Sequence, residues 1–114
     1  MLKFDNDASI YLRTCSTDMR KSINGLSSIV VNDMELDLFN SGYFVFCNKS
    51  RRLMKIIYWD KTGFALWYKR LEKNKFPWPK DENDVKKISN EQMGWLLSGI
   101  DFFKAHKKLH FSTL

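Results

Sequence analysis

The sequence predicts a small α+β domain, in which a mostly antiparallel β-sheet is packed by two helices. Aromatic and β-branched residues concentrate between residues 43 and 70, where short polar breaks divide them into three strand-like runs. Two further segments, about 17–31 and 89–99, carry apolar residues at helical spacing. A chain of 114 residues is long enough for one domain, residues 1–114, with its own core.

The first strand and the first helix are expected before residue 32. Residues 9–15 alternate Ile10 and Leu12 with polar neighbours, which is typical of a short, half-buried strand. Ser16 or Thr17 can cap a helix over 17–31, in which Gly25 indicates close packing, with the sheet as a candidate neighbour. The apolar stripe of this helix consists of Met19, Ile23, Leu26 and Val30.

The middle of the chain predicts a three-stranded meander. Its strands are YFVFCN (43–48), LMKIIYWD (53–60) and FALWYKR (64–70), separated by breaks short enough for antiparallel hairpins. The prolines of FPWP (76–79) forbid a central strand, so this stretch should end the sheet as an edge or extended segment.

The last third predicts a loop, a helix and a tail. Residues 81–89 are charged and are expected to form a loop. Ser89 followed by Gln92 three positions later is typical of a capping box, which starts the helix over 89–99. The tail, 102–114, is basic and aromatic.

The second hairpin predicts a register. Asp60, Lys61, Thr62 and Gly63 resemble a three-residue loop with a left-handed glycine, so that Asp60 would pair with Phe64. This register places Lys55 directly opposite Lys69, on the face that also carries Trp59 and Trp67. The tryptophans are either a stacking platform for nucleic-acid bases or part of the core.

Composition indicates a cytoplasmic protein that does not span a membrane. No apolar run approaches the roughly 20 residues needed to cross a bilayer. The N-terminal residues carry acids where a signal peptide would be basic. Cys15 and Cys47 lie in strand-like runs and are interpreted as small buried residues in a reducing compartment.

The net charge of +6 is unevenly distributed. Residues 49–80 contain ten Lys or Arg and two acids, which makes this region the source of the basicity. Such a pattern favours a polyanion, DNA or RNA, or an acidic protein surface, although a solvated lysine-rich surface has the same composition. The turn at 49–52 holds three cations and is either an anion-binding tip or a solubilising loop.

No enzymatic site is indicated. His106 and His110 have the spacing of metal ligands on a helix, but no cysteine pair or nearby Glu completes a set. A metal-binding triad of Asp18, Asp60 and Asp101 is conceivable, but each has a simpler local role. These roles are an acid in the first turn of a helix, the flank of a turn and a loop after a helix. We therefore expect no metal, no cofactor and no catalysis.

An ordered series of short motifs gives a family resemblance over about residues 10–101. The motifs are Thr17-Asp18-Met19-Arg20-Lys21, Gly25-Leu26, Phe44-Val45-Phe46, Tyr58-Trp59-Asp60, Gly63-Phe64, Tyr68-Lys69-Arg70-Leu71-Glu72, Phe76, Trp78-Pro79 and Leu96-Leu97-Ser98-Gly99-Ile100-Asp101. In this series the chain resembles the small accessory protein of the insertion-sequence-66 family, called TnpB or Orf2-like, which is distinct from the RNA-guided nuclease sharing that label. The resemblance implies an accessory of DNA transposition encoded beside a separate, larger transposase that carries the catalytic acids.

Arg20 and Lys21 match the most recognisable motif of this family. We interpret them as contacts to phosphate or to a partner, with an Arg20 ion pair to Asp18 or to another acid as the structural alternative. The predicted nucleic-acid-binding residues are Arg20, Lys21, Lys49, Arg51, Arg52, Lys55, Lys69, Arg70, Lys73, Lys75 and Trp78. Those from Arg51 to Lys75 are expected on one contiguous surface.

Two functions remain open at this point. The protein is either a DNA-binding accessory, acting on element ends or target DNA, or an adaptor that binds the transposase without contacting DNA. Alanine at Arg51, Arg52 and Lys69 should weaken DNA binding without lowering the melting temperature if the first is right.

Overall fold

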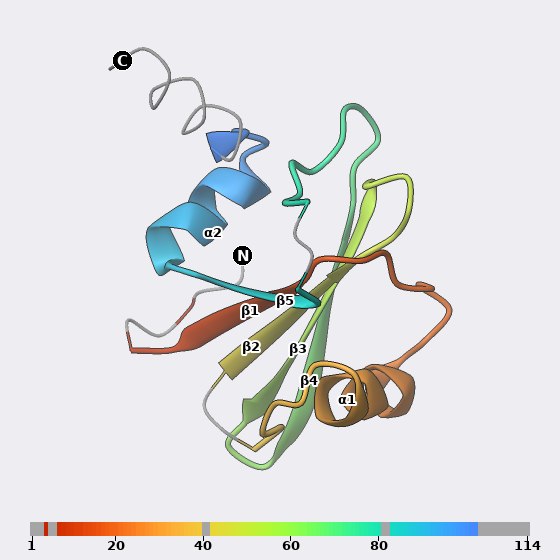
Figure 1. The fold of residues 1–114 in the computed structure, drawn as a ribbon, viewed down its shortest axis with the longest axis vertical. Helices are drawn as coiled ribbons and strands as arrows, with labels where there is room; N and C mark the ends of the chain where they lie inside the picture. The colour runs from red at the N-terminus through yellow and green to blue at the C-terminus, as the bar shows by residue number, and fades with distance from the viewer. Residues whose placement is uncertain (1–3, 5–6, 40–41, 81–82, 103–114) are drawn as a thin grey trace.

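A computed structural model describes residues 4, 7–39, 42–80 and 83–102 (Figure 1). Five strands form one sheet in the order β4-β3-β2-β1-β5. β2 (Gly42–Cys47), β3 (Leu53–Asp60) and β4 (Gly63–Arg70) form the antiparallel meander that the sequence predicts. The fold is therefore α+β, as expected.

The chain enters the sheet through a parallel pair. β1 (Ser9–Arg13) lies parallel to β2, and the connection between them contains α1 (Ile23–Asn32). Parallel neighbours need such a crossover connection. Because both strands run the same way, the residues that follow β1 and β2 emerge at the same end of the sheet.

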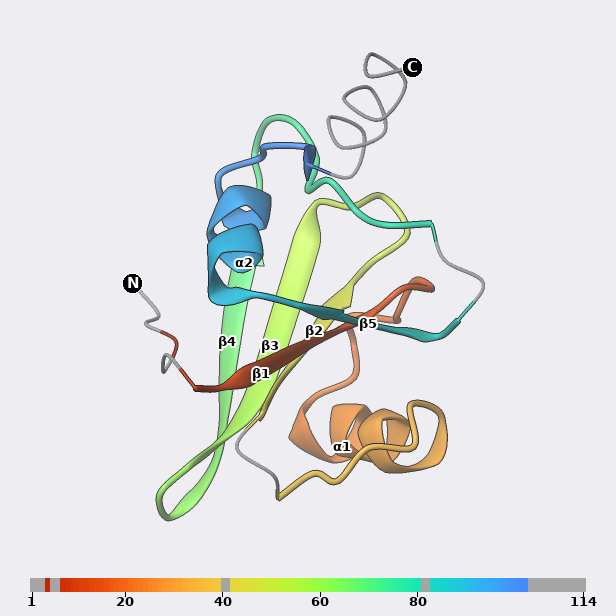
Figure 2. The same ribbon diagram turned by 60° about the vertical axis from the view of Figure 1, so that its left-hand side comes forward.

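Each face of the sheet is covered by one helix (Figures 1 and 2). On one face, Met93 and Leu96 of α2 (Asn90–Leu97) pack with Ile10, Val45 and other buried residues. On the other face, α1 contributes to a second core cluster. This cluster consists of Leu26, Ile29, Val30, Met34, Phe44, Phe46 and Ile57.

The first helix begins later than predicted. Residues 18–21 form a turn, closed by a bond from the Lys21 N–H to the Asp18 carbonyl, and Ser22 is the N-cap of α1. Asp18 bonds the Arg20 backbone N–H through its side chain at 2.9 Å, so its carboxylate stabilises the turn and not a helix end. The expected caps Ser16 and Thr17 lie outside the helix.

The predictions for Gly25 and for the apolar stripe of the first helix also need correction. Leu26 and Val30 are buried as expected, whereas Met19 precedes the helix and packs on the second cluster from there. The close neighbour of Gly25 is the side chain of Lys21, not the sheet: a Cβ added at Gly25 would lie 3.1 Å from the Lys21 Cβ.

The predicted register of the second hairpin is wrong by one residue. Asp60 pairs with Gly63, not Phe64, and the turn contains two residues, not three. Lys61 takes the left-handed conformation (φ 54°) that the prediction assigns to Gly63. Consequently Lys55 faces Tyr68, while Lys69 faces Met54. Since successive side chains point to opposite faces, Lys55 and Lys69 lie on opposite faces of the sheet.

Part of the segment predicted as a charged loop, 81–89, forms a strand. β5 (Val85–Ile88) pairs antiparallel with β1 and forms an edge of the sheet. Its sequence, VKKI, is short and half charged, and lysine is a common residue on edge strands because it discourages further strand pairing.

The end of the chain follows the prediction in its described part. Ser89 caps α2, and both hydrogen bonds of the capping box with Gln92 are present. Helix α2 ends at Leu97, two residues before the predicted end. The predicted tail lies outside the described residues from 103 onward, as do His106 and His110.

Candidate nucleic-acid interface

Three basic segments meet at one end of the sheet, and we refer to residues 14–22, 48–52 and 69–80 together as the basic end. The Thr17 N–H donates to the Cys47 carbonyl at 2.9 Å, which joins the first segment to the end of β2, directly before the second segment. Leu71 and Phe76 donate to the carbonyls of Arg52 and Arg51 at 2.8 and 2.7 Å, which joins the second to the third. The fold thus brings together cations from segments distant in the sequence.

Asn48 fixes the turn between β2 and β3. Its side-chain oxygen accepts the backbone N–H groups of Arg52 and Leu53, at 3.1 and 3.0 Å. Its amide donates to the Ser50 hydroxyl at 3.0 Å. The sequence prediction omits Asn48, although asparagine before a turn commonly makes such bonds.

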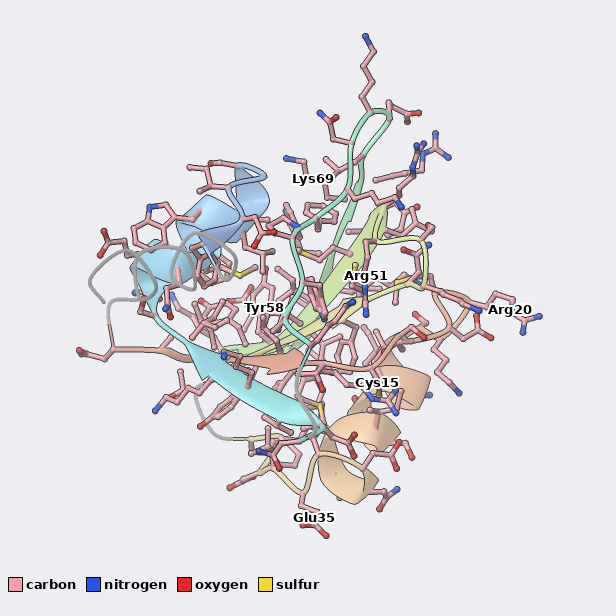
Figure 3. All side chains as sticks on the ribbon, turned by 45° about the horizontal axis from the view of Figure 1, so that its top comes forward. Cys15, Arg20, Glu35, Arg51, Tyr58 and Lys69 are labelled. Carbon is pink, nitrogen blue, oxygen red and sulfur yellow. The ribbon has the colours of Figure 1, made fainter. Side chains whose placement is uncertain are left out.

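Arg20 carries the ion pair that the sequence left as the structural alternative. Its guanidinium bonds both carboxylate oxygens of Asp18, the shortest contact being 2.7 Å from Nη2 to Oδ2. The Arg20 side chain nevertheless remains 91% exposed and extends away from the fold (Figure 3). The side-chain and backbone hydrogen bonds from Arg20 lower the pKa of Asp18 to about 2. The pair is charged at neutral pH and oriented, yet accessible to an anion.

Arg51 turns inward, unlike its neighbour Arg52. With φ of 62°, Arg51 places its Nη2 3.3 Å from the Thr14 carbonyl and its guanidinium 5.5 Å from the centre of the Trp78 ring. Its Nη1 is buried without a hydrogen-bond partner. The Trp78 Nε1 donates to the Arg13 carbonyl at 2.9 Å. Arg51 and Trp78 therefore connect the ends of β1 and β2 to the segment after β4.

Lys55 also makes its contacts within the folded chain. Its ammonium donates to the carbonyls of Met19 and Lys21, at 2.7 and 2.8 Å, and lies 5.9 Å from the centre of the Tyr68 ring. The contiguous surface expected to contain both Lys55 and Lys69 does not form.

The other predicted cations of the basic end are exposed. Arg70 bonds Glu72 at 2.9 Å, and the pair is largely exposed at 61% and 75%. Asp18 and Glu72 are the acidic residues of these three segments. The exposed predicted cations are Arg20, Lys21, Lys49, Arg52, Lys69, Arg70, Lys73 and Lys75.

An open cleft of about 750 Å³ lies between the first two segments. Its lining consists of Ser16, Thr17, Asp18, Met19, Arg20, Asn48, Lys49, Ser50 and Leu53, and the acid among them, Asp18, is paired with Arg20. Cations and hydroxyl groups around an open depression are a chemistry that suits a phosphate group.

The tryptophans of the second hairpin do not form one platform. Trp67 pairs with Ile56 and packs against the first core cluster, whereas Trp59 pairs with Phe64 and is 41% exposed on the other face. Both belong to strands, but Trp59 lies at the end of the sheet away from the basic end.

Cys15 departs from its prediction, and Cys47 follows it. Cys15 lies beyond the end of β1 and is exposed, whereas Cys47 is buried in β2. Desolvation raises the pKa of Cys47 to about 11, and the nearby Arg51 partly opposes this shift. The Cys47 thiol is therefore uncharged at neutral pH.

No metal site and no membrane-spanning helix are found in the part of the chain that the structure describes. There, no three His, Cys, Asp or Glu side chains are grouped so as to hold a metal ion. Neither α1 nor α2 has the length and apolarity to cross a bilayer.

The chain is similar to a family of proteins and to two bacterial relatives. The family described as IS66 Orf2 like protein matches residues 8–107. The uncharacterized protein y4hO of Sinorhizobium fredii is 35% identical over 102 residues, covering 90% of this chain and 89% of the relative. The uncharacterized protein y4jC of the same organism is 31% identical over 99 residues, covering 87% and 85%. No solved structure gives a significant match.

Proposed function

The chain belongs to the IS66 Orf2-like family of transposition accessory proteins, and from this premise we propose that it binds DNA through the basic end without catalysing a reaction. In this proposal its partners are DNA of the element ends or of the target and the separate transposase, and it acts in the cytoplasm. The single observation that carries the proposal is the convergence of three basic segments at one end of the sheet.

The charge balance of the basic end supports an anionic partner. The exposed cations outnumber Asp18 and Glu72, and Arg20 and Arg70 pair with these acids while staying accessible. Exposed ion pairs of this kind contribute only about 0–1 kcal/mol, so stability alone gives little reason to gather so many cations. Phosphates would neutralise them and release bound counterions.

The rigid framework beneath the cations also supports the proposal. Arg51 bonds the second segment to the first, Lys55 bonds β3 to the first, and Trp78 bonds the third segment to the end of β1, each through a backbone carbonyl. Cations on ordered turns lose less conformational entropy on binding than cations on free loops. We infer that these three residues position the surface and that the exposed cations contact phosphate.

Lys73 and Lys75 provide the direct test. We expect the variant Lys73→Ala/Lys75→Ala to bind labelled duplex DNA more weakly in fluorescence anisotropy, by a similar factor for unrelated sequences. The slope of log affinity against log salt should fall by up to about 1.8, since each neutralised phosphate contributes about 0.9.

The matched control is Lys61→Ala/Lys87→Ala, which removes the same charge from exposed positions outside the basic end. Both variants should melt as the wild type does, because surface substitutions usually change stability by no more than about 0.5 kcal/mol. Equal DNA affinity of the two variants would refute the assignment to the basic end. Absence of DNA binding by the wild type would favour the adaptor that binds the transposase alone.

A further inference from the structure

An exposed aromatic cluster lies at the end of the sheet opposite the basic end, where β3 turns into β4. It consists of Phe39, Trp59 and Phe64. The ring centre of Phe39 lies 5.7 Å from that of Trp59 and 5.5 Å from that of Phe64, and the latter two are 5.0 Å apart. Phe39 is 68% exposed and Trp59 is 41% exposed, so the cluster faces solvent.

The cluster extends the second core beyond α1. Trp59 and Phe64 are a cross-strand pair next to Ile57 and Leu66, which belong to or pack on that core. Phe39 comes from the segment after α1, in which Leu36 and Leu38 pack on the second core. Rings that continue a core into solvent in this way are typical of a protein-binding surface.

The charges beside the cluster are mainly negative. Asp37 accepts the Phe39 backbone N–H through its carboxylate at 3.0 Å, and Asp60 follows Trp59 directly. Glu35 lies in the same connection, and Lys61 at the hairpin turn is the cation of this region. The balance is opposite to that of the basic end. Phosphates would be repelled here, so stacked bases are a poor match to these rings.

We propose that this acidic aromatic cluster docks a cationic segment of a partner protein that also carries an apolar side chain. Aromatic rings supply the apolar contact and can hold an Arg or Lys over their faces. Asp37 and Asp60 supply charge complementarity at the rim, which selects the sign of the partner. The protein would then hold DNA at one end and a basic protein segment at the other.

Synthetic peptides test the proposal by titration calorimetry at about 0.15 M salt. The probe is a peptide with leucine and lysine at helical spacing. One matched peptide has glutamate in place of lysine, and another has serine in place of leucine. We expect binding of the leucine–lysine peptide alone.

Two variants locate the binding site. Phe39→Ser should weaken binding about tenfold or more, as removal of a central aromatic anchor usually does. Asp37→Asn/Asp60→Asn should weaken it severalfold, because asparagine at position 37 can still accept the Phe39 N–H. The controls are Ile100→Ser, which removes an exposed apolar side chain elsewhere, and Asp84→Asn/Glu91→Gln, which removes two exposed charges elsewhere. Both controls should bind like the wild type.

Four outcomes would overturn the proposal. Unchanged peptide affinity of folded Phe39→Ser would place the peptide elsewhere, and equal binding of the leucine–glutamate peptide would remove the charge argument. Sedimentation showing a wild-type oligomer that becomes monomeric in Phe39→Ser would assign the cluster to a second copy of the chain. Loss of DNA affinity in Phe39→Ser would assign it to DNA. Absence of peptide binding alongside intact DNA binding would count against this cluster alone. The function proposed for the basic end would be unaffected.

Discussion

The ammonium of Lys55, near the start of β3, donates a hydrogen bond at 2.7 Å to the main-chain carbonyl of Met19 in the turn before α1. A second bond reaches the carbonyl of Lys21 at 2.8 Å. One lysine thus satisfies two carbonyls of this segment, and it holds the first segment of the basic end against β3.

Lys55→Met should therefore destabilise the protein, although it keeps a side chain of similar length. We expect a loss of about 1–3 kcal/mol in the free energy of unfolding, because two carbonyls lose a charged donor. Urea denaturation measures the change. Lys69→Met, at an exposed position, should change stability by no more than about 0.5 kcal/mol. Equal stability of the two variants would contradict a structural role of Lys55.

Arg51 and Arg52 are adjacent in the chain but should respond differently to alanine. Arg51→Ala removes the contacts to the Thr14 carbonyl and the Trp78 ring, with an expected loss of about 1–3 kcal/mol. Arg52→Ala should leave stability nearly unchanged and weaken DNA binding. Thermal melting and DNA titration of both variants separate the two roles. A destabilised Arg52→Ala would show that the exposed arginine also supports the fold.

Asp18 should titrate well below an ordinary aspartate. Its pKa is lowered from 3.8 to about 2 by hydrogen bonds from Arg20, so the native state favours the ionised form. The ion pair therefore stabilises the turn above about pH 4, and this contribution is lost as pH falls through about 2. Carbon-13 NMR of the side-chain carboxyl measures the midpoint. In Arg20→Gln the midpoint should move back toward 3.8, and a wild-type midpoint near 3.8 would exclude the pair in solution.

The two cysteines should differ in reactivity. At pH 8 an aromatic disulfide reagent should label exposed Cys15 rapidly, whereas buried Cys47, with its pKa near 11, should react only after unfolding. Cys15→Ser should abolish the fast phase, and Cys47→Ser should retain it. Rapid labelling of native Cys15→Ser would indicate that β2 opens readily.

Local sequence determined the elements whose formation depends on neighbouring residues. The runs between 43 and 70 are dense in aromatic and β-branched residues, and they form strands in that order. The capping box of Ser89 and Gln92 starts α2 at the predicted residue, because both of its hydrogen bonds close within one turn. The concentration of cations between 49 and 80 likewise required only the sequence.

Tertiary structure decided the features that depend on distant partners. The start of α1 shifted because Asp18 closes a turn on Arg20, and because Lys55 of β3 holds the carbonyls of Met19 and Lys21. β5 forms because β1 offers a free edge, which outweighs the weak strand propensity of VKKI. A one-residue difference in the turn at Lys61 moved Lys55 and Lys69 to opposite faces.

The candidate site shows the same division. Sequence placed Arg51 and Arg52 side by side with the same charge, and nothing local distinguishes them. The left-handed backbone at Arg51 turns its side chain toward the Thr14 carbonyl and the Trp78 ring, which come from distant segments, and leaves Arg52 in solvent. The number of cations was therefore fixed by sequence. Which of them remain exposed was decided by carbonyls and rings that only the folded chain brings close.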